Sequence, residues 1–272
     1  MVGRTSPLPA LSRALPVLVR AAEAGGRAAL AFHTPGATTR AKIRYKLHNS
    51  PVTEADLAAD AAIRAVIAEG LPQVLIQSEE DDGPPARIGP APTLVMDPID
   101  GTRAFIAGRS EWCVSLALFV GQKPVAGVIH APARKELFSA ATGLGAWLNG
   151  QPLPRRSAPV GRAMRLTGPN RLVDTLTDHW PASTDGETLR ALAYRLVSVA
   201  AGAHDVAVAT IGANHWDIAA ADVLLSETGC ALRTLTGGWP VYNGPDPVHP
   251  ALLAAEGGLA ERLVAALSKT PA

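Results

Sequence analysis

The sequence predicts an α/β protein built from two unequal halves, and three observations carry that prediction. Two helical stretches and a series of closely spaced apolar strands fill the first half. Strands and helices alternate in the second half, and an Asn-, Gly-, Pro- and Arg-rich stretch at 149–161 separates the two. We therefore expect subdomains at 1–155 and 156–272. The chain has 272 residues, of which 47% are apolar and 18% charged, enough for a sizeable core.

The first half begins with two helices, at 8–32 and from Thr53 to Gly70. Pro16 lies within the first helix, where proline disfavours continuation of the helix. A turn-rich basic loop at 34–51 joins the two helices. Strands are expected at 74–77, 93–96, 113–120, 125–130 and 136–140. Because the last three strands are joined by short turns, they predict an antiparallel sheet.

In the second half, periodic apolar residues indicate helices between short strands. Leu189, Leu192, Leu196 and Val199 share one helical face. A strand at 205–210 precedes a helix from Trp216 to Glu227, which Gly229 closes. A strand at 252–255 and a helix at 259–267 complete the chain.

Composition excludes several classes of protein. The formal net charge of +1 gives no global field for nucleic acid or a membrane surface, so a phosphate substrate would need local positive charge such as a metal ion. Cys113 and Cys230 lie in apolar stretches and are expected as buried thiols. There is no membrane-span-length apolar run and no secretory signal, so we expect a cytoplasmic protein.

The segment Asp97-Pro98-Ile99-Asp100-Gly101-Thr102 follows an apolar strand and carries the clearest chemical signal. Two carboxylates three residues apart, aimed to the same side of a turn, would repel each other unless a divalent cation lay between them. The backbone N–H groups of Gly101 and Thr102 would suit a phosphate at a helix start. Alone, the segment is also compatible with a surface turn, because Asp, Pro and Gly favour turns.

Three other acidic segments have a structural interpretation when taken singly. Glu79 and Glu80 follow a strand, as solvated acidic loops do. Thr53 to Asp56 fits a capping box, and Asp217 fits a helix start.

Their combination, in this order along the chain, resembles the inositol monophosphatase superfamily of metal-dependent, lithium-sensitive phosphatases. The resemblance runs from about Lys46 to Asn243 and implies a layered α-β-α-β-α sandwich. Within the superfamily the chain is most similar to the 3′(2′),5′-bisphosphate nucleotidases, through residues 49–56, 101–106 and 114–118.

The resemblance also implies a role for each matching residue. Glu79, Asp97 and the Ile99 carbonyl would hold one Mg²⁺, and Asp97, Asp100 and Asp217 a second, within a complement of two or three ions. Asp56 and Thr102, with Glu79, would activate the attacking water. Gly101, Thr102, Asp217, Lys46 and Arg195 would contact the substrate. Hard oxygen ligands favour Mg²⁺ over Zn²⁺.

The substrate side departs from the bisphosphate nucleotidase pattern. Ala191-Leu192-Ala193 stands where that branch has a Gly-Ser-Ser segment, an arginine expected near Ala209 is missing, and Gly244 replaces a frequent lysine. Arg195 keeps the charge of a family lysine.

We therefore weigh three hypotheses for a small phosphorylated metabolite as ligand, without nucleic acid or membrane partners. The leading one is hydrolysis of 3′-phosphoadenosine 5′-phosphate. The second keeps the chemistry but changes the substrate to inositol monophosphate, histidinol phosphate or fructose 1,6-bisphosphate. The third is a metabolite sensor without turnover. Relatives suggest a monomer or homodimer.

Overall fold

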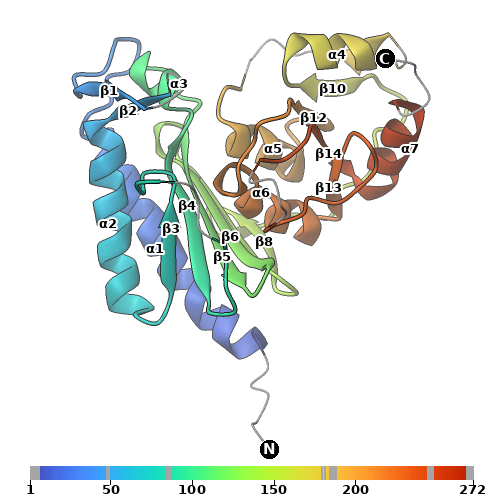
Figure 1. Cartoon of the computed structure of the whole chain (residues 1–272). Helices are drawn as coiled ribbons and strands as arrows, with labels where there is room; N and C mark the ends of the chain where they lie inside the picture. The colour runs from blue at the N-terminus through green and yellow to red at the C-terminus, as the bar shows by residue number, and fades with distance from the viewer. Residues whose placement is uncertain are drawn as a thin grey trace, which may run out of the picture.

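The computed structural model describes residues 7–46, 50–83, 87–178, 180, 182–183, 189–243 and 248–267. Its helices and sheets form five layers, in the order helix, sheet, helix, sheet, helix (Figure 1). The layered α/β sandwich expected from the sequence is confirmed.

A seven-stranded sheet forms the second layer, with strand order β3-β4-β5-β6-β7-β8-β9. Its strands are β3 (Leu75–Ser78), β4 (Thr93–Asp100), β5 (Cys113–Val120), β6 (Lys123–Ala131), β7 (Glu136–Ala141), β8 (Gly145–Leu148) and β9 (Gln151–Pro152). All neighbours pair antiparallel except β3 and β4, which are parallel. The antiparallel prediction is thus correct for the consecutive strands. The pair β3 and β4 is parallel because the fourteen residues between them bring the chain back to the end of the sheet where β3 began.

The fourth layer is a mixed sheet of five strands in the order β11-β10-β12-β14-β13. These strands are β10 (Met164–Thr167), β11 (Ala182–Ser183), β12 (Val206–Ala209), β13 (Cys230–Thr234) and β14 (Leu252–Glu256). The seven-stranded sheet ends at Pro152 and this sheet begins at Met164, on either side of most of the stretch 149–161. The division into subdomains at residue 155 stays a prediction.

Helices fill the other three layers. They are α1 (Pro7–Leu30), α2 (Glu54–Gly70), α3 (Thr102–Ile106), α4 (Asn170–Thr177), α5 (Leu192–Ala201), α6 (His215–Glu227) and α7 (Gly257–Leu267). The pair α1 and α2 covers one face of the seven-stranded sheet, α5 and α6 lie between the sheets, and α4 and α7 cover the outer face of the second (Figure 1). The helix α1 continues through Pro16. Because Pro16 is exposed, water can compensate for the backbone hydrogen bond that proline cannot donate.

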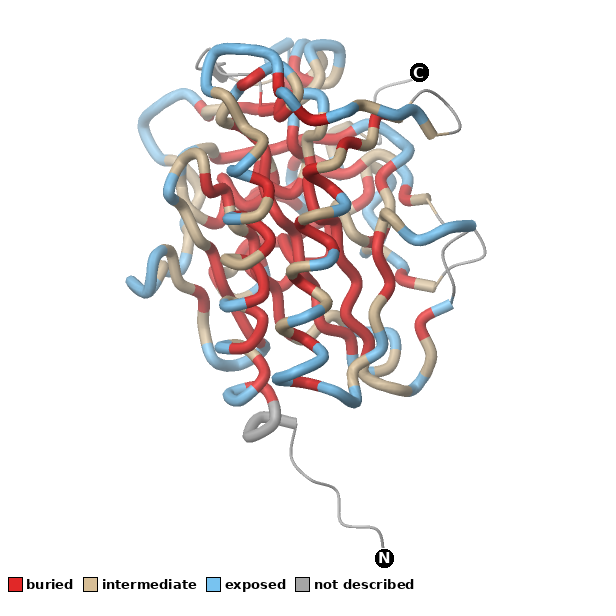
Figure 2. Tube along the Cα trace, turned by 90° about the vertical axis from the view of Figure 1, so that its left-hand side faces the viewer, coloured by how far each residue is buried: buried red, intermediate tan, exposed pale blue. Residues whose placement is uncertain are grey.

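The central helix α6 lies very close to β6, and a glycine makes that approach possible. A Cβ added to Gly127 would stand 2.4 Å from the Ala220 carbonyl oxygen. The largest hydrophobic cluster joins the central strands, α5, α6 and the second sheet, and Figure 2 shows these buried segments running through the interior. The position of α6 is therefore tightly restricted by packing.

Several expectations need correction. Leu189 precedes α5, which begins at Leu192, because the backbone at Ala191 is still extended. The loop expected at 34–51 contains two short paired strands, β1 (Ile43–Tyr45) and β2 (Pro51–Thr53). Cys113 and Cys230 are buried free thiols, as expected.

Asp205, just before β12, is a buried acid held by two arginines. Its carboxylate accepts hydrogen bonds from Arg162 at 2.6 and 2.7 Å, and from the Arg165 side chain and backbone. Burial opposes ionisation, but these donors outweigh it and hold the pKa of Asp205 well below its usual range.

We expect Asp205→Asn to lower the free energy of unfolding by about 2 kcal/mol, because the two guanidinium groups lose their counter-charge while Arg162 stays partly solvated. Urea denaturation at pH 7 measures this change. Arg262→Gln, which alters an exposed cation, is the control, and an unchanged midpoint for Asp205→Asn would contradict the expectation.

Candidate functional site

The end of β4 carries two aspartates that a β-bulge turns to the same side. Asp97 pairs with Ser115 and Asp100 with Cys113, so three residues of β4 span two of β5. In a regular strand, residues three apart would face opposite sides of the sheet. The extra residue cancels that alternation. The sequence predicted a turn at Pro98, but the strand runs through to Asp100. The bulge, and not a turn, brings Asp97 and Asp100 to the same side of the sheet.

The third aspartate comes from the start of α6. Asp217 accepts a hydrogen bond from the Asn214 N–H at 2.7 Å through one oxygen, so it caps its own helix. Carboxylate oxygens of Asp97, Asp100 and Asp217 all lie within 4.8 Å of one another. The capping role of Asp217 is therefore observed, and its predicted role as a metal ligand stays a prediction.

Burial and mutual repulsion perturb these carboxylates strongly. Burial, followed by the charges of Glu79 and neighbouring aspartates, raises the pKa of Asp97 well above its usual range. Burial and the charge of Asp100 do the same for Asp217. Burial raises the pKa of Asp100 to about 6, although two backbone N–H groups oppose the shift.

Glu79 stands beside this trio, within hydrogen-bonding reach of Asp97. Lys46 anchors its segment. The ammonium donates to the Glu79 backbone carbonyl at 3.0 Å, pairs with Glu80 at 2.8 Å and lies 3.8 Å from the Glu79 carboxylate. Glu80 is thus the main ionic partner of Lys46, a role that the sequence did not assign. The position of Lys46 beside the acidic cluster is compatible with its predicted substrate contact.

Asp56 and Thr102 meet on the other side of the site. One oxygen of Asp56 accepts from the backbone N–H and hydroxyl of Thr53 at 2.8 and 2.6 Å, which completes the capping box. The other oxygen lies 3.4 Å from the Thr102 hydroxyl, which also lies 3.0 Å from the Ile99 carbonyl. Burial raises the pKa of Asp56 to about 6, against the Thr53 donors. Gly101 is in the left-handed region, with φ of 88°, and caps the N-terminus of the five-residue helix α3, which begins at Thr102.

The predicted substrate side is less well supported by the geometry. Asp100 accepts from the backbone N–H groups of Leu192 and Ala193 at 3.1 and 2.6 Å, so it ties β4 to the start of α5. Arg195, on α5, donates instead to the backbone carbonyls of Leu189 and Val208. Its guanidinium therefore supports the fold of this segment. Gly244 lies outside the described residues.

Sequence reasoning missed Ser115, which joins the two parts of the acidic trio. Ser115 is 1% exposed in the middle of β5, pairs with Asp97, and donates from its hydroxyl to the Trp216 carbonyl at 2.8 Å. The hydrogen bond fixes the residue just before Asp217 to the sheet that carries the other two aspartates. The available signal was one hydroxyl within the apolar run Cys113–Val120.

We expect Ser115→Ala to raise the dissociation constant for Mg²⁺, the cation expected from the sequence, by about tenfold, because Asp217 loses its fixed position. Calorimetric titration with Mg²⁺ measures this shift. Ser226→Ala, on an exposed turn of the same helix, is the control. Equal Mg²⁺ affinities for Ser115→Ala and the unaltered protein would contradict this role.

The acidic cluster fits a divalent cation on chemical grounds. Every donor is a hard oxygen, at least three carboxylates converge, and no lysine or arginine of the described chain forms an ion pair with Asp97, Asp100 or Asp217. A cation with at least two charges would remove the repulsion that raises their pKa values.

The model of the inositol monophosphatase family matches residues 12–272. The chain belongs to the inositol monophosphatase family of phosphatases. An inositol-1-monophosphatase from Synechocystis sp. is 32% identical over 228 residues, which cover 81% of this chain and 77% of the relative. A histidinol-phosphatase from Chlorobaculum parvum is also 32% identical over 229 residues, covering 82% and 85%. The family assignment made from the motifs is confirmed, while the bisphosphate nucleotidase branch is not specifically supported.

Among solved structures, the inositol monophosphatase from Anabaena superposes with a TM-score of 0.77 at 25% identity. The match covers 96% of this chain and 98% of the other. Helices of the described residues are all too short or too polar to cross a bilayer.

Proposed function

We propose that this family member is a Mg²⁺-dependent phosphomonoesterase of small phosphorylated alcohols, with inositol monophosphate and histidinol phosphate as the leading candidate substrates. The observation that carries the proposal is the convergence of Asp97, Asp100 and Asp217 beside Glu79, on a fold shared with relatives that bear those two names. An alcohol phosphate also needs no second anion site, and the Arg195 guanidinium already donates to the backbone carbonyls of Leu189 and Val208.

The residues divide into two groups by what they can hold. Glu79, Asp97 and the Ile99 carbonyl would hold one Mg²⁺, and Asp97 with Asp100 and Asp217 a second. When bound, the ions supply charge stabilisation at the phosphoryl group and lower the pKa of water. Sharing Asp97 between them explains why that side chain is the most crowded by negative charge.

The chain itself then handles the attacking water through Asp56 and Thr102. The Thr102 hydroxyl has one proton, which it donates either to Ile99 or to Asp56. In either case, its free lone pairs can accept a hydrogen bond from water and orient it. Asp56 can take up the proton, because burial already raises its pKa to about 6.

The 3′-phosphoadenosine 5′-phosphate hypothesis remains a weaker proposal. Its support is the resemblance at 49–56, 101–106 and 114–118. Against it stand the names of the relatives and the use of Arg195 by the backbone.

A substrate panel tests the proposal. Phosphate release is measured with Mg²⁺ for inositol 1-phosphate, histidinol phosphate, 3′-phosphoadenosine 5′-phosphate and fructose 1,6-bisphosphate, with Asp97→Asn as the inactive control. Preference for either alcohol phosphate supports the proposal. Preference for the adenosine bisphosphate would instead assign the chain to the nucleotidase branch. Mg²⁺ binding without any turnover would favour the hypothesis of a metabolite sensor.

A further inference from the structure

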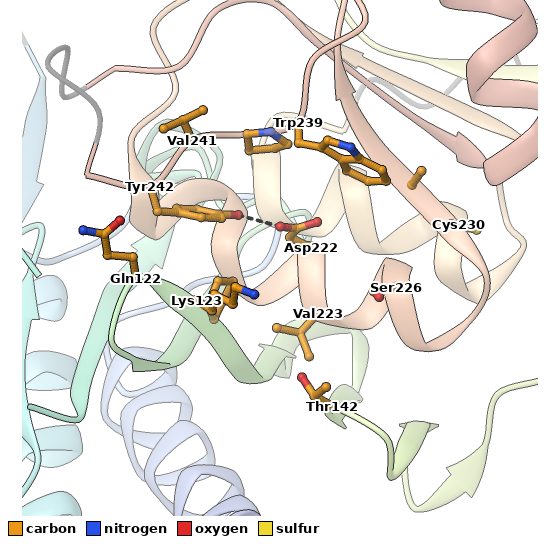
Figure 3. Close-up of a pocket in the computed structure, with 13 residues that line it drawn as sticks. Gln122, Lys123, Thr142, Asp222, Val223, Ser226, Cys230, Trp239, Val241 and Tyr242 are labelled. Atoms are coloured by element: carbon orange, nitrogen blue, oxygen red, sulfur yellow. Dashed lines mark hydrogen bonds between the residues drawn. The ribbon is translucent and has the colours of Figure 1, made fainter. Parts of the chain in front are cut away.

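A pocket that shares no residue with the acidic cluster is lined by residues of α6 and of both sheets. Its volume is about 750 Å³, within the range of small-molecule sites. The walls come from the β5–β6 turn, α6, the start of β13 and the segment 239–242, as Figure 3 shows. The metal centre described above uses none of these residues.

The pocket contains a carboxylate without a cationic partner. Asp222 accepts a hydrogen bond from the Tyr242 hydroxyl at 2.9 Å through one oxygen (Figure 3). No lysine or arginine among the described residues forms an ion pair with it. Burial raises the pKa of Asp222 to about 6, and the Tyr242 hydrogen bond opposes the shift only in part. A cationic hydrogen-bond donor would complete this site.

Two further side chains suggest the rest of the ligand. Lys123 lines the same pocket and forms no ion pair within the described chain, so it can receive an anionic group. Trp239 is 59% exposed and Arg233, which is not a lining residue, covers one ring face at 3.7 Å from the centroid. The remaining indole surface can stack against a flat ring.

Tyr242 connects this pocket to the metal centre. Its ring packs against His215 with the centroids 5.4 Å apart, and the next backbone N–H, that of Asn243, donates to His215 at 3.2 Å. His215 is two residues before Asp217 at the start of α6, and Asp222 is five residues after it on the same helix. A ligand that moves Tyr242 or Asp222 therefore acts on the helix end that carries Asp217.

We propose that this pocket is an effector site for an aromatic amino acid, whose ammonium group pairs with Asp222, carboxylate with Lys123 and ring with Trp239. Binding at the pocket changes the Mg²⁺ affinity of the acidic cluster through Tyr242 and α6. The effect is reciprocal, so Mg²⁺ changes the affinity for the amino acid by the same factor.

Calorimetric titration of the full-length protein with L-tryptophan tests the binding. Tryptamine, which lacks the carboxylate, and indole-3-propionate, which lacks the amine, are the matched comparisons. We expect L-tryptophan to bind more tightly than either, and Asp222→Asn to weaken it by about tenfold or more, because a charge-assisted hydrogen bond is lost. Asp174→Asn, an identical change on the exposed surface of α4, should leave the affinity unchanged.

Three results would overturn the proposal. The first is equal affinity for L-tryptophan and indole-3-propionate, and the second is equal affinity of the unaltered protein and Asp222→Asn for L-tryptophan. The third is a Mg²⁺ dissociation constant that saturating L-tryptophan leaves unchanged, which removes the effector role. Both readouts are binding constants, so they stand apart from the choice of substrate and from failure of the phosphatase assay.

Discussion

We expect Asp97→Asn to abolish phosphate release, with kcat/KM at least about 10³-fold lower, and to give a metal-free protein that melts at a higher temperature. The loss of activity follows from the shared role of Asp97, since both proposed Mg²⁺ positions use its carboxylate. Metal ions contribute several kcal/mol of transition-state stabilisation, and about 4 kcal/mol corresponds to that factor.

The gain in stability has the opposite physical origin. Asp97 is 3% exposed and its pKa is raised by burial, by Glu79 and by two neighbouring aspartates. At pH 7.5 without metal, replacing it by a neutral amide of the same shape removes repulsion, and each kcal/mol gained raises Tm by about 2–4 °C.

Measuring both activity and Tm distinguishes loss of the metal site from loss of the folded structure. Activity is followed by phosphate release in saturating Mg²⁺, and Tm by circular dichroism in a chelator. Asp174→Asn is the matched control on α4 and should change neither. An active Asp97→Asn would refute the metal assignment, and a lower metal-free Tm would refute the repulsion argument.

The strongly periodic elements of this chain could be predicted from sequence, and so could the acidic residues of the site. The strand Cys113–Val120 agrees to the residue, and the ends of α2 and α6 lie within one residue of their predictions. Their boundaries carry local signals, namely the capping residues Thr53 and Asn214 and the glycine turn after Val120.

Contacts between distant segments were beyond sequence reasoning. Nothing local in Ser115 indicates that its hydroxyl reaches the Trp216 carbonyl, one hundred and one residues away. The bulge between Asp97 and Asp100 depends on the register of β5, which no periodicity in β4 reveals. Arg195 makes another contact that the sequence does not indicate, because its guanidinium donates to the backbone carbonyls of Leu189 and Val208, and its substrate contact stays a prediction.

The shortest strands were not predicted from the sequence, for a different reason. The strands β1, β2, β9 and β11 have two or three residues each and form only because partners lie beside them. Such segments have too few residues for any period to be detected. Asp56 illustrates a further ambiguity, because a capping aspartate and a functional aspartate look identical in sequence. Here one oxygen of Asp56 forms part of the capping box and the other faces Thr102.

We expect the metal-free protein to lose stability as the pH rises from 5 to 8, and we expect Mg²⁺ to reverse that trend. The folded pKa values of Asp56 and Asp100 are raised to about 6, above the ordinary value for aspartate, and those of Asp97 and Asp217 are raised well above that ordinary value. A group of this kind contributes stability below its unfolded pKa, and the contribution is lost as the pH rises through its folded pKa. Asp205 has the opposite sign, but its contribution is complete above pH 5.

Mg²⁺ binds the ionised carboxylates, so its effect grows as the pH rises. At 100 to 1,000 times its dissociation constant, a bound ion stabilises the folded state by about 2.7 to 4.1 kcal/mol, an increase in Tm on the order of 10 °C. Thermal denaturation at pH 5, 6.5 and 8, with Mg²⁺ or with a chelator, should give two lines of opposite slope. Asp97→Asn should flatten both, because it removes the carboxylate that the two ions share. Parallel lines for the unaltered protein would mean that the acidic cluster does not hold Mg²⁺, and the proposed chemistry would fail with it.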